Sequence, residues 1–262
     1  MEDRSKSTKE LAMQQFGAHA GHYVTSALHA QGPDLKWLVE QAALSGTERL
    51  LDVATGGGHV VNALAPLVRE AVACDLTPEM LEAARGLLAA NGRTNVTFAE
   101  GDAEALPFGE AAFDLVTCRI AAHHFPDPNA FVRECRRVLR PDGRLLLVDN
   151  VCPEEPDADA LYNEVEQTRD PSHFRAWTKA EWIARLEGAG LKVHSLEAFP
   201  KTFRFQDWCE RMGVEPAVRE HLERKLLDAP EPLRRRLGVQ EEAGRLVSFA
   251  GESVLIAASP RA

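Results

Sequence analysis

Short apolar runs alternate with longer stretches of helical periodicity from residue 49 onward. Each run is almost continuously apolar, as expected for strands that helices cover on both faces of a sheet. The runs occupy residues 49–54, 70–75, 96–100, 113–119 and 144–149. Because a helical segment follows each run, the pattern predicts repeated strand–helix units around a parallel sheet.

Helix-start signals stand between the predicted strands. Thr77 and Asp127 are each followed by proline, which suits the first position of a helix, and both side chains suit the preceding N-cap position. Thr178 and Glu181 have the spacing of a capping box. We therefore expect helices to begin at these three points.

The regular alternation breaks after the fifth predicted strand. Residues 152–177 contain an acidic amphipathic segment and a loop, and about 205–240 reads as a polar helical stretch that is too long for a hairpin loop. We interpret both as helical insertions. Two further strands are expected at residues 191–199 and 245–257.

The length of 262 residues suits one large α/β domain. We expect a helical lid at residues 1–33 and a single domain at 34–262 that carries the two insertions.

The formal net charge of −10 opposes a general affinity for nucleic acid, whose phosphates are neutralised by Lys and Arg. Five cysteines without a Cys-x-x-Cys pair predict neither a disulfide framework nor a zinc site. No stretch of about 18 apolar residues suggests a membrane span, so we expect a cytoplasmic protein.

Polar and glycine residues gather where the predicted strands end, which is where open parallel sheets bind ligands. Asp52 precedes the turn at residues 55–58, in which Gly56 and Gly58 allow a sharp bend and a close approach of the backbone to a ligand. Asp75 ends the second strand, where its carboxylate could accept hydrogen bonds from both hydroxyls of a ribose. Asp102 follows the third strand, where it could accept a hydrogen bond from an adenine amino group.

Each of these features also has a purely structural interpretation. A run of glycines can be a tight strand-to-helix connection, and glycine-rich turns serve several nucleotide chemistries. Asp75 could cap the helix at Thr77, and Asp102 could form an Asx-type turn. The three carboxylates Asp52, Asp75 and Asp102 at successive strand ends nevertheless favour a nucleoside-containing cofactor.

The order of the motifs resembles the class I S-adenosylmethionine-dependent methyltransferases. The motifs are Asp52-x-Ala54-x-Gly56-x-Gly58, Asp75, Gly101-Asp102-Ala103, Phe113-Asp114-Leu-Val and Val138-Leu-Arg-Pro-Asp-Gly143. They cover about residues 45–200 and are most similar to the branch related to the ubiquinone and menaquinone C-methyltransferases. The resemblance implies a doubly wound, Rossmann-like sheet of seven mostly parallel strands with an antiparallel last strand.

The resemblance also implies roles for individual residues. It places Gly56, Gly58 and Arg119 near the methionine part of the donor, Asp75 on the ribose, and Asp102 with Ala103 on the adenine. An aromatic residue of the lid often covers the donor in this branch, which points to Tyr23. From the sequence itself, Asp52 suits the cationic end of the donor, and Leu76 is placed to pack on the adenine. Ala54 stands where the commoner family pattern has glycine.

The exit of the fourth strand is the natural place for a general base, because methyl transfer to a hydroxyl or carbon acid requires a proton acceptor. His123 and His124 lie there, and we prefer His124; a structural role for the pair is the alternative. His173, Phe174, Arg175 and Trp177 could line an acceptor pocket or could anchor the insertion. The spacing of the histidines does not suit a metal, so none is expected.

These observations predict methyl transfer from S-adenosyl-L-methionine, with S-adenosyl-L-homocysteine as product, to a small-molecule acceptor. By analogy the acceptor is aromatic, quinone-like or polyketide-like, and O-, N-, S- and C-methylation all stay open, as does a homodimer. One alternative is a non-catalytic S-adenosylmethionine-binding protein. The other is an NAD(P)-dependent oxidoreductase, against which Val61 replaces the third glycine of the dinucleotide fingerprint.

Overall fold

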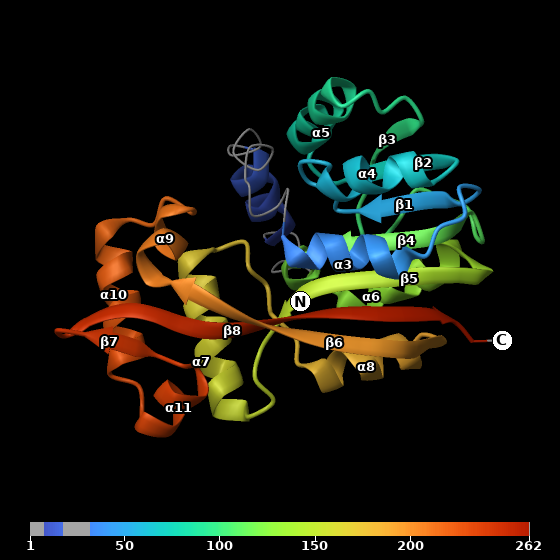
Figure 1. Cartoon of the computed structure of the whole chain (residues 1–262). Helices are drawn as coiled ribbons and strands as arrows, with labels where there is room; N and C mark the ends of the chain where they lie inside the picture. The colour runs from blue at the N-terminus through green and yellow to red at the C-terminus, as the bar shows by residue number, and fades with distance from the viewer. Residues whose placement is uncertain (1–7, 18–31, 262) are drawn as a thin grey trace.

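The computed structural model describes residues 8–17 and 32–261, and one mixed sheet runs through the whole molecule (Figure 1). The strand order is β3-β2-β1-β4-β5-β8-β6, and the short β7 pairs with β8. Strands β1 to β5 are parallel, whereas β8 runs antiparallel between β5 and β6. The strand bounds are β1 (Arg49–Val53), β2 (Glu70–Asp75), β3 (Val96–Glu100), β4 (Phe113–Arg119), β5 (Leu139–Val151), β6 (Leu191–Arg204), β7 (Gln240–Glu242) and β8 (Arg245–Pro260). The predicted doubly wound, mostly parallel sheet with an antiparallel last strand is confirmed.

Helices cover both faces of this sheet. α3 (Pro33–Ala42), α4 (His59–Leu64) and α5 (Pro78–Ala90) bury leucine, valine and alanine side chains against one face. α6 (Pro128–Val138) and α8 (Lys179–Gly188) pack against the other face, where the core includes Phe131 and Trp182. Burial on both faces explains why the central strands are nearly continuous apolar runs.

The two predicted insertions come together as a second lobe (Figure 1). The lobe contains α7 (Pro156–Arg169), α9 (Phe205–Glu210), α10 (Pro216–Leu227), α11 (Glu231–Arg236) and β7. It has its own core, in which Tyr162, Trp208 and Phe249 are almost fully buried. The long strands β6 and β8 extend from the main sheet into this lobe and pair along almost their whole length. We call residues 152–177 and 205–242 the cap.

The observed strands correct several predicted boundaries. The second, third and fourth strands have the predicted ends, but the first ends at Val53 because Ala54 adopts a φ of 52°. The fifth, sixth and last strands are longer than predicted. β6 and β8 continue because each supplies the other's hydrogen bonds beyond the main sheet, which apolar patterning does not show. The strand β7 was not predicted.

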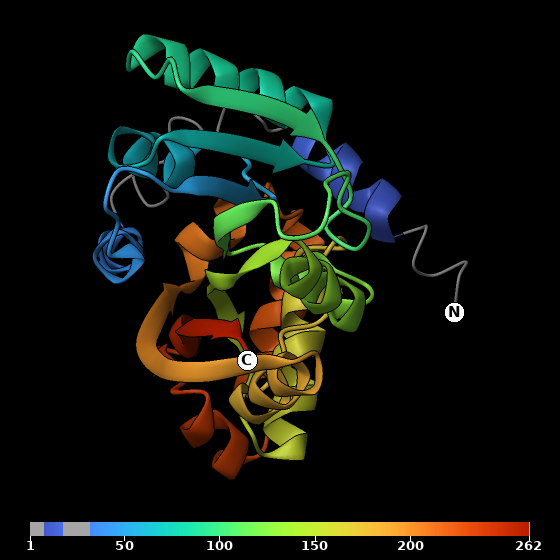
Figure 2. The same cartoon turned by 90° about the vertical axis from the view of Figure 1, so that its right-hand side faces the viewer.

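The N-terminal lid is described only in part. Residues 8–17 are helical and lie near the carboxyl ends of the central strands (Figure 2), and α3 begins at Pro33. Tyr23 lies outside the described residues, so its predicted contact with the donor stays a prediction. Over the ranges 8–17 and 32–261, no helix has the length and apolar character that a membrane span requires.

Candidate active site

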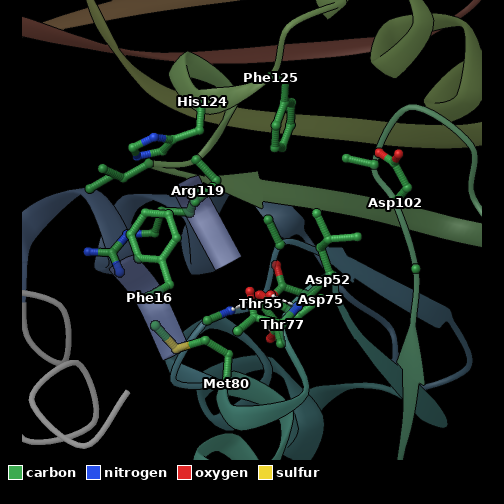
Figure 3. Close-up of a pocket in the computed structure, with 18 of the residues that line it drawn as sticks. Phe16, Asp52, Thr55, Asp75, Thr77, Met80, Asp102, Arg119, His124 and Phe125 are labelled. Carbon is green, nitrogen blue, oxygen red and sulfur yellow. Dashed lines mark hydrogen bonds between the residues drawn. The ribbon is translucent and has the colours of Figure 1, made fainter. Parts of the chain in front are cut away.

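A cavity opens at the carboxyl ends of β1, β2, β3 and β4, and Phe16 of the helix of residues 8–17 also lines it (Figure 3). Most of its surface comes from the loops that follow these strands. Its lining includes most of the predicted cofactor residues, namely Asp52, Ala54, Gly56, Asp75, Leu76, Asp102, Ala103 and Arg119. His124 lines the same cavity, whereas Gly58 and His123 are not among the described lining residues.

Asp52 is the most deeply buried carboxylate of the cavity. Its side chain accepts hydrogen bonds from the hydroxyls of Thr55 and Thr117, both at 2.7 Å. Burial raises the pKa of Asp52 to about 6, although the two hydroxyls act in the opposite direction. The ionised form of this buried carboxyl is unfavourable by itself. A positively charged ligand in the cavity would therefore stabilise it strongly.

The turn after β1 explains why small residues stand there. Gly56 has a φ of 52°, and a Cβ atom at this position would meet no atom within 4 Å, so the space beside it is open for a ligand. Gly58 has a φ of 82°, and its Cβ would lie 2.9 Å from the Cβ of Ala84 on α5. Gly58 thus has a packing reason to be glycine. Ala54 adopts a left-handed φ of 52°, a conformation that glycine adopts more easily.

Asp75 organises the same turn from the end of β2. One carboxylate oxygen accepts from the backbone N–H of Gly56 at 2.8 Å and the other from the backbone N–H of Thr77 at 2.9 Å. The carboxylate therefore holds Thr77, the residue before α5, and the Thr77 hydroxyl does not accept the expected N-cap hydrogen bond from the helix. Burial raises the pKa of Asp75, and the backbone bonds oppose this rise. The Thr77 side chain and the Leu76 backbone also act to lower this pKa, and the carboxylate lines the cavity, where a ligand hydroxyl can approach it.

Asp102 connects the loop after β3 to the N-terminal helix. Its carboxylate accepts from the backbone N–H of Glu104 at 2.9 Å, as in an Asx-type turn, and pairs with Lys9 Nζ at 2.7 Å. Lys9 also pairs with Glu104. Lys9, Ala12 and Phe16 all line the cavity and are spaced so that they share one face of the helix. The described part of the lid therefore covers the cavity with that face.

Arg119, the last residue of β4, also lines the cavity. Its Nε lies 2.6 Å from a carboxylate oxygen of Asp34 in the first turn of α3, and both side chains are largely buried. The pair therefore joins the end of β4 to α3. Ile120, the next residue, has a φ of 53°, which is unusual for a β-branched side chain and marks a strained point in the cavity wall.

The two adjacent histidines lie on η2 (Ala122–His124) and have different partners. His123 Nδ1 lies 2.6 Å from Oδ1 of Asp149, which is fully buried at the end of β5. His124 Nδ1 lies 2.9 Å from the backbone oxygen of Ser172 in the cap. The His124 ring meets Phe16 edge-on, with ring centroids 4.9 Å apart. His124 is thus the histidine of the pair that faces the cavity.

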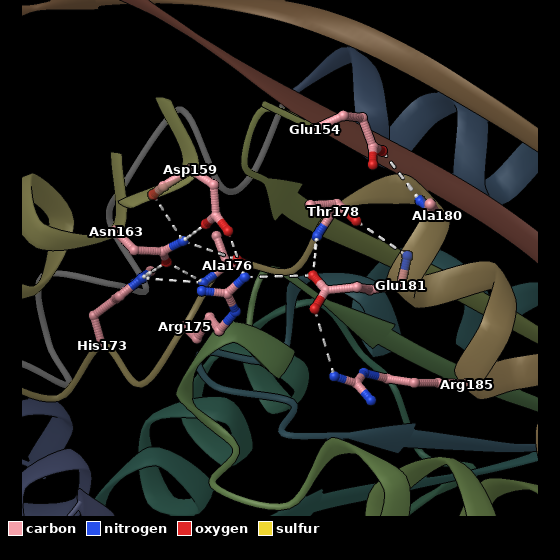
Figure 4. A network of polar contacts seen from close by, with 10 residues as sticks. All are labelled: Glu154, Asp159, Asn163, His173, Arg175, Ala176, Thr178, Ala180, Glu181 and Arg185. Atoms are coloured by element: carbon pink, nitrogen blue, oxygen red, sulfur yellow. Dashed lines mark hydrogen bonds and ion pairs between the residues drawn. The ribbon is translucent and has the colours of Figure 1, made fainter. Parts of the chain in front are cut away.

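Of the four cap residues considered for an acceptor pocket, His173 and Arg175 belong to a polar network within the cap and with α8 (Figure 4). Arg175 pairs with Asp159 at 2.6 Å, and the guanidinium groups of Arg175 and Arg185 both lie over the Trp177 ring. His173 Nε2 lies 3.1 Å from Oδ1 of Asn163. The described lining of the cavity includes none of His173, Phe174, Arg175 or Trp177. Their arrangement matches the alternative that they anchor the insertion.

Sequence reasoning missed several residues of this site. Thr117 and Asp149 left a readable signal, since each is a polar residue that directly follows a short apolar run, Leu115–Val116 and Leu145–Val148 respectively. The sequence around Lys9 and Ser172 gives no such signal, because their partners lie 93 and 48 positions away along the chain. The part of the chain that the structure describes has no group of three or more His, Cys, Asp or Glu side chains arranged to hold a metal ion.

The cavity combines features that suit one class of ligand. Two buried carboxylates, Asp52 and Asp75, lie at the ends of neighbouring strands, and open space adjoins Gly56. Leu76, Met80 and other apolar side chains line the adjoining wall. This arrangement fits a ligand with a positively charged end, a pair of hydroxyls and a flat apolar ring.

Comparison with known proteins agrees with this chemistry. Residues 51–147 match the family model described as "Methyltransferase domain". The chain is 39% identical over 205 residues to the Bacillus subtilis methyltransferase YcgJ, whose activity is uncharacterised, covering 78% of this chain and 81% of the relative. It is 32% identical to the ubiquinone biosynthesis O-methyltransferase of Xanthomonas euvesicatoria, over 72% of this chain and 71% of that protein.

A solved structure extends the similarity to most of the chain. A Bacillus halodurans C-125 protein, provisionally assigned as a methyltransferase, superposes with a TM-score of 0.86 and 48% sequence identity. The match covers 88% of this chain and all of that chain. The sequence, the sheet and the cavity therefore agree, and the chain belongs to the S-adenosylmethionine-dependent methyltransferases.

Proposed function

We propose that this enzyme transfers the methyl group of S-adenosyl-L-methionine to a hydroxyl of a small aromatic molecule and leaves S-adenosyl-L-homocysteine. The observation that carries the proposal is the pair of buried carboxylates, Asp52 and Asp75, beside the open space at Gly56. S-adenosylmethionine supplies a methyl group that is activated by the positive charge of its sulfonium. The protein then has mainly to position the donor and acceptor and to exclude water.

The cavity residues suit different parts of the donor. Asp52 supplies negative charge for the cationic methionine end, and Ala54 and Gly56 keep the neighbouring backbone accessible. Asp75 has lone pairs for the ribose hydroxyls, and Asp102 has them for the adenine amino group. Further proposed contacts come from Leu76, Ala103 and Arg119, which line the cavity. Gly58 contributes through the helix packing that shapes the turn.

The acceptor is proposed to enter beside His124. Phe16, Ile120 and Phe125 line this part of the cavity with apolar surface, which suits an aromatic ring. An imidazole at the same place can accept the proton that a phenolic hydroxyl must lose. The similarity to an enzyme named ubiquinone biosynthesis O-methyltransferase supports an aromatic, quinone-like acceptor.

The nicotinamide alternative has less support. Val61, at the position of the third glycine of the dinucleotide fingerprint, is fully buried on α4. Asp52 also places negative charge where a dinucleotide would bring its pyrophosphate. A cytoplasmic location and a homodimer stay predictions.

Calorimetric titration of the full chain with S-adenosylmethionine, S-adenosylhomocysteine and NADH tests the donor assignment. We expect the first two to bind and NADH not to bind. Asp75→Asn, which keeps one acceptor oxygen for the turn, should weaken donor binding, whereas Asp228→Asn, a substitution far from the cavity, should leave it unchanged. Binding of NADH alone would refute the proposal.

Transfer of a labelled methyl group to a panel of phenols, catechols and quinols tests the acceptor class. We expect transfer to at least one of them. His124→Gln should retain donor binding but lose about 10²-fold or more in rate, as is usual when a general base is removed. Transfer confined to amines or thiols would contradict the acceptor class while leaving the donor assignment intact.

A further inference from the structure

The adjacent histidines on η2 differ in the kind of atom that holds them. Nδ1 of His123 lies 2.6 Å from a carboxylate oxygen of Asp149, which is negatively charged when ionised. Nδ1 of His124 lies 2.9 Å from the backbone oxygen of Ser172, which is neutral. The first arrangement favours an imidazolium, and the second favours a neutral imidazole with a defined tautomer.

The tautomer of His124 follows from its partner. A backbone carbonyl oxygen can only accept a hydrogen bond, so Nδ1 of His124 must carry the hydrogen. A neutral imidazole has one N–H, which leaves the lone pair on Nε2. Among the described residues, Nε2 has no hydrogen-bond partner, and the ring lines the cavity beside Phe16. A basic nitrogen is therefore available on the proposed acceptor side.

The loop that holds this tautomer belongs to the cap and is itself fixed by Asp170. Oδ1 of Asp170 accepts from the backbone N–H of Ser172 at 2.9 Å and from its hydroxyl at 2.6 Å. Asp170 and Ser172 are both almost fully buried. The Ser172 hydroxyl oxygen also lies 3.3 Å from His124 Nδ1. Asp170 therefore determines where the Ser172 carbonyl points.

The same loop is attached to η2 through the backbone. The N–H groups of Phe174 and Arg175 both lie 2.9 Å from the carbonyl oxygen of His123. These bonds and the Ser172–His124 contact form one continuous junction between the cap and the donor-binding domain. A movement of the loop would thus change the hydrogen bonding of His124 directly.

The charges around the pair act in opposite directions on the two rings. Burial lowers the pKa of His123, but the carboxylate of Asp149, with smaller effects from Glu166 and Asp170, produces a net rise. For His124, burial and the neighbouring His123 cation lower the pKa to about 4, against weaker opposing effects of Asp170, Asp149 and the Ser172 carbonyl.

His173 is a third imidazole beside the pair, with ring centroids 5.3 Å and 6.4 Å from those of His123 and His124. Burial, followed by the two neighbouring histidines, holds its pKa well below the usual range. Of the three rings, His123 is therefore the one that most favours the protonated form.

We propose that the two histidines have different functions: Nε2 of His124 is the general base, and Asp149, His123, Asp170 and Ser172 are positioning residues that fix its tautomer and keep it unprotonated. This inference rests on the proposed methyl transfer to a hydroxyl. Nε2 takes the hydroxyl proton while the acceptor oxygen bonds to the methyl carbon, and the broken methyl–sulfur bond leaves its electron pair on sulfur. One positive charge disappears from sulfur and one appears on His124, so the cavity gains no net charge.

Nitrogen-15 NMR of the histidine side chains in the full chain tests the tautomer without any acceptor. We expect His124 to be neutral near pH 7 with its hydrogen on Nδ1, and His123 to titrate at a higher pH than His124. The exposed His194 of β6, which lies outside this cluster, serves as an internal reference in the same spectra. A protonated His124, or one with its hydrogen on Nε2, would overturn the inference.

Two substitutions at Asp170 separate positioning from folding. Asp170→Asn keeps an acceptor oxygen for Ser172 and should preserve the His124 tautomer. Asp170→Ala removes that oxygen and should give a mixture of tautomers and a lower transfer rate, with donor affinity unchanged. If both variants have the wild-type tautomer, Asp170 does not position His124. If Asp170→Ala unfolds, the Asn variant and the wild-type spectrum still decide the assignment.

Asp149→Asn tests the charge on His123. The amide can still accept from His123, but the negative charge that keeps this ring protonated is gone. His123 should titrate at lower pH than in the wild type, and the titration of His124 should move to higher pH because the positive charge on its neighbour is less favoured. An unchanged His124 titration would refute the role of the Asp149–His123 pair. Absence of donor binding would instead refute the proposed function, and the spectra distinguish the two failures.

Discussion

Lys9 Nζ lies 2.7 Å from Oδ2 of Asp102, which joins the N-terminal helix to a loop 93 positions further along the chain. The ion pair places the face of the helix that contains Phe16 across the cavity. The carboxylate of Asp102 is the one proposed to contact the adenine. Asp102 would therefore take part both in holding the helix of residues 8–17 over the cavity and in binding the donor.

We expect Lys9→Met to accelerate both association and dissociation of S-adenosylmethionine. Lys9 is partly exposed, so the ion pair contributes at most about 1 kcal/mol, which corresponds to a change of roughly fivefold. Stopped-flow binding measurements can determine both rate constants. High salt should accelerate wild-type dissociation toward that of the variant, because salt screens the pair.

Lys36→Met is the matched control for this experiment. Lys36 is also a helical lysine with a carboxylate partner, but it is exposed and does not line the cavity. Its substitution should leave both rate constants unchanged. Equal effects of the two substitutions would show that Lys9 does not act by closing the helix.

Donor binding should be linked to the protonation of Asp52. Because burial raises the pKa of this carboxyl to about 6, a substantial fraction of the free enzyme holds a proton there at pH 6. A cationic ligand favours the ionised form, so binding near pH 6 should release a proton, and affinity should fall as the pH falls through 6. Calorimetry in two buffers with different ionisation enthalpies measures this release.

Thr117→Val provides a sharper test of the same linkage. The Thr117 hydroxyl donates to Asp52 and lowers its pKa, so its removal should raise the pKa and move proton release to higher pH. Asp52→Asn should abolish the release altogether. Proton release that persists in Asp52→Asn would assign it to another group, such as Asp75.

Ala54→Gly should stabilise the protein. Ala54 has a left-handed φ of 52°, which costs an alanine more than a glycine. We expect the free energy of unfolding to rise by about 0.5–1 kcal/mol, measured by urea denaturation. Ala89→Gly, at an exposed position of α5, should instead lower it by about 1 kcal/mol. A loss of stability in Ala54→Gly would show that the alanine side chain contributes packing that outweighs the strain.

The central sheet and its carboxylates could be predicted because their signals are local. Buried parallel strands are continuous apolar runs, and Asp52 and Asp75 stand at the ends of such runs. Chain direction then brings those ends to one edge of the sheet. The resemblance to a known family supplied the antiparallel last strand, which no local pattern indicates.

The remaining parts of the site depend on contacts between distant segments. Ser172 meets His124 across 48 positions, and Lys9 meets Asp102 across 93. Nothing in the residues around Ser172 indicates that its carbonyl orients a histidine. The cap residue Trp177 looked equally suited to a pocket or an anchor, and only its contacts with the guanidinium groups of Arg175 and Arg185 distinguish these roles.

Asp34→Asn should destabilise the protein and weaken donor binding together. Asp34 pairs with Arg119 at 2.6 Å, and removal of the carboxylate charge takes this ion pair away from a largely buried guanidinium. We expect the free energy of unfolding to fall by about 3 kcal/mol near pH 7. Arg119 lines the cavity, so its greater freedom should also lower donor affinity.

The effect should depend on pH in a defined direction. Burial acts to raise the pKa of Asp34, but the hydrogen bond and charge of Arg119 outweigh it, so the folded-state pKa is lowered. A lowered carboxyl pKa stabilises the fold above the unfolded-state value, near pH 4, and this stability is lost as the pH falls through the folded-state value. The unfolding free energies of wild type and Asp34→Asn should therefore converge at acid pH.

Glu40→Gln, which removes the exposed partner of Lys36, should change stability by less than about 0.5 kcal/mol at any pH. A difference between wild type and Asp34→Asn that stays constant as the pH falls would mean that the carboxylate charge is not what joins α3 to β4.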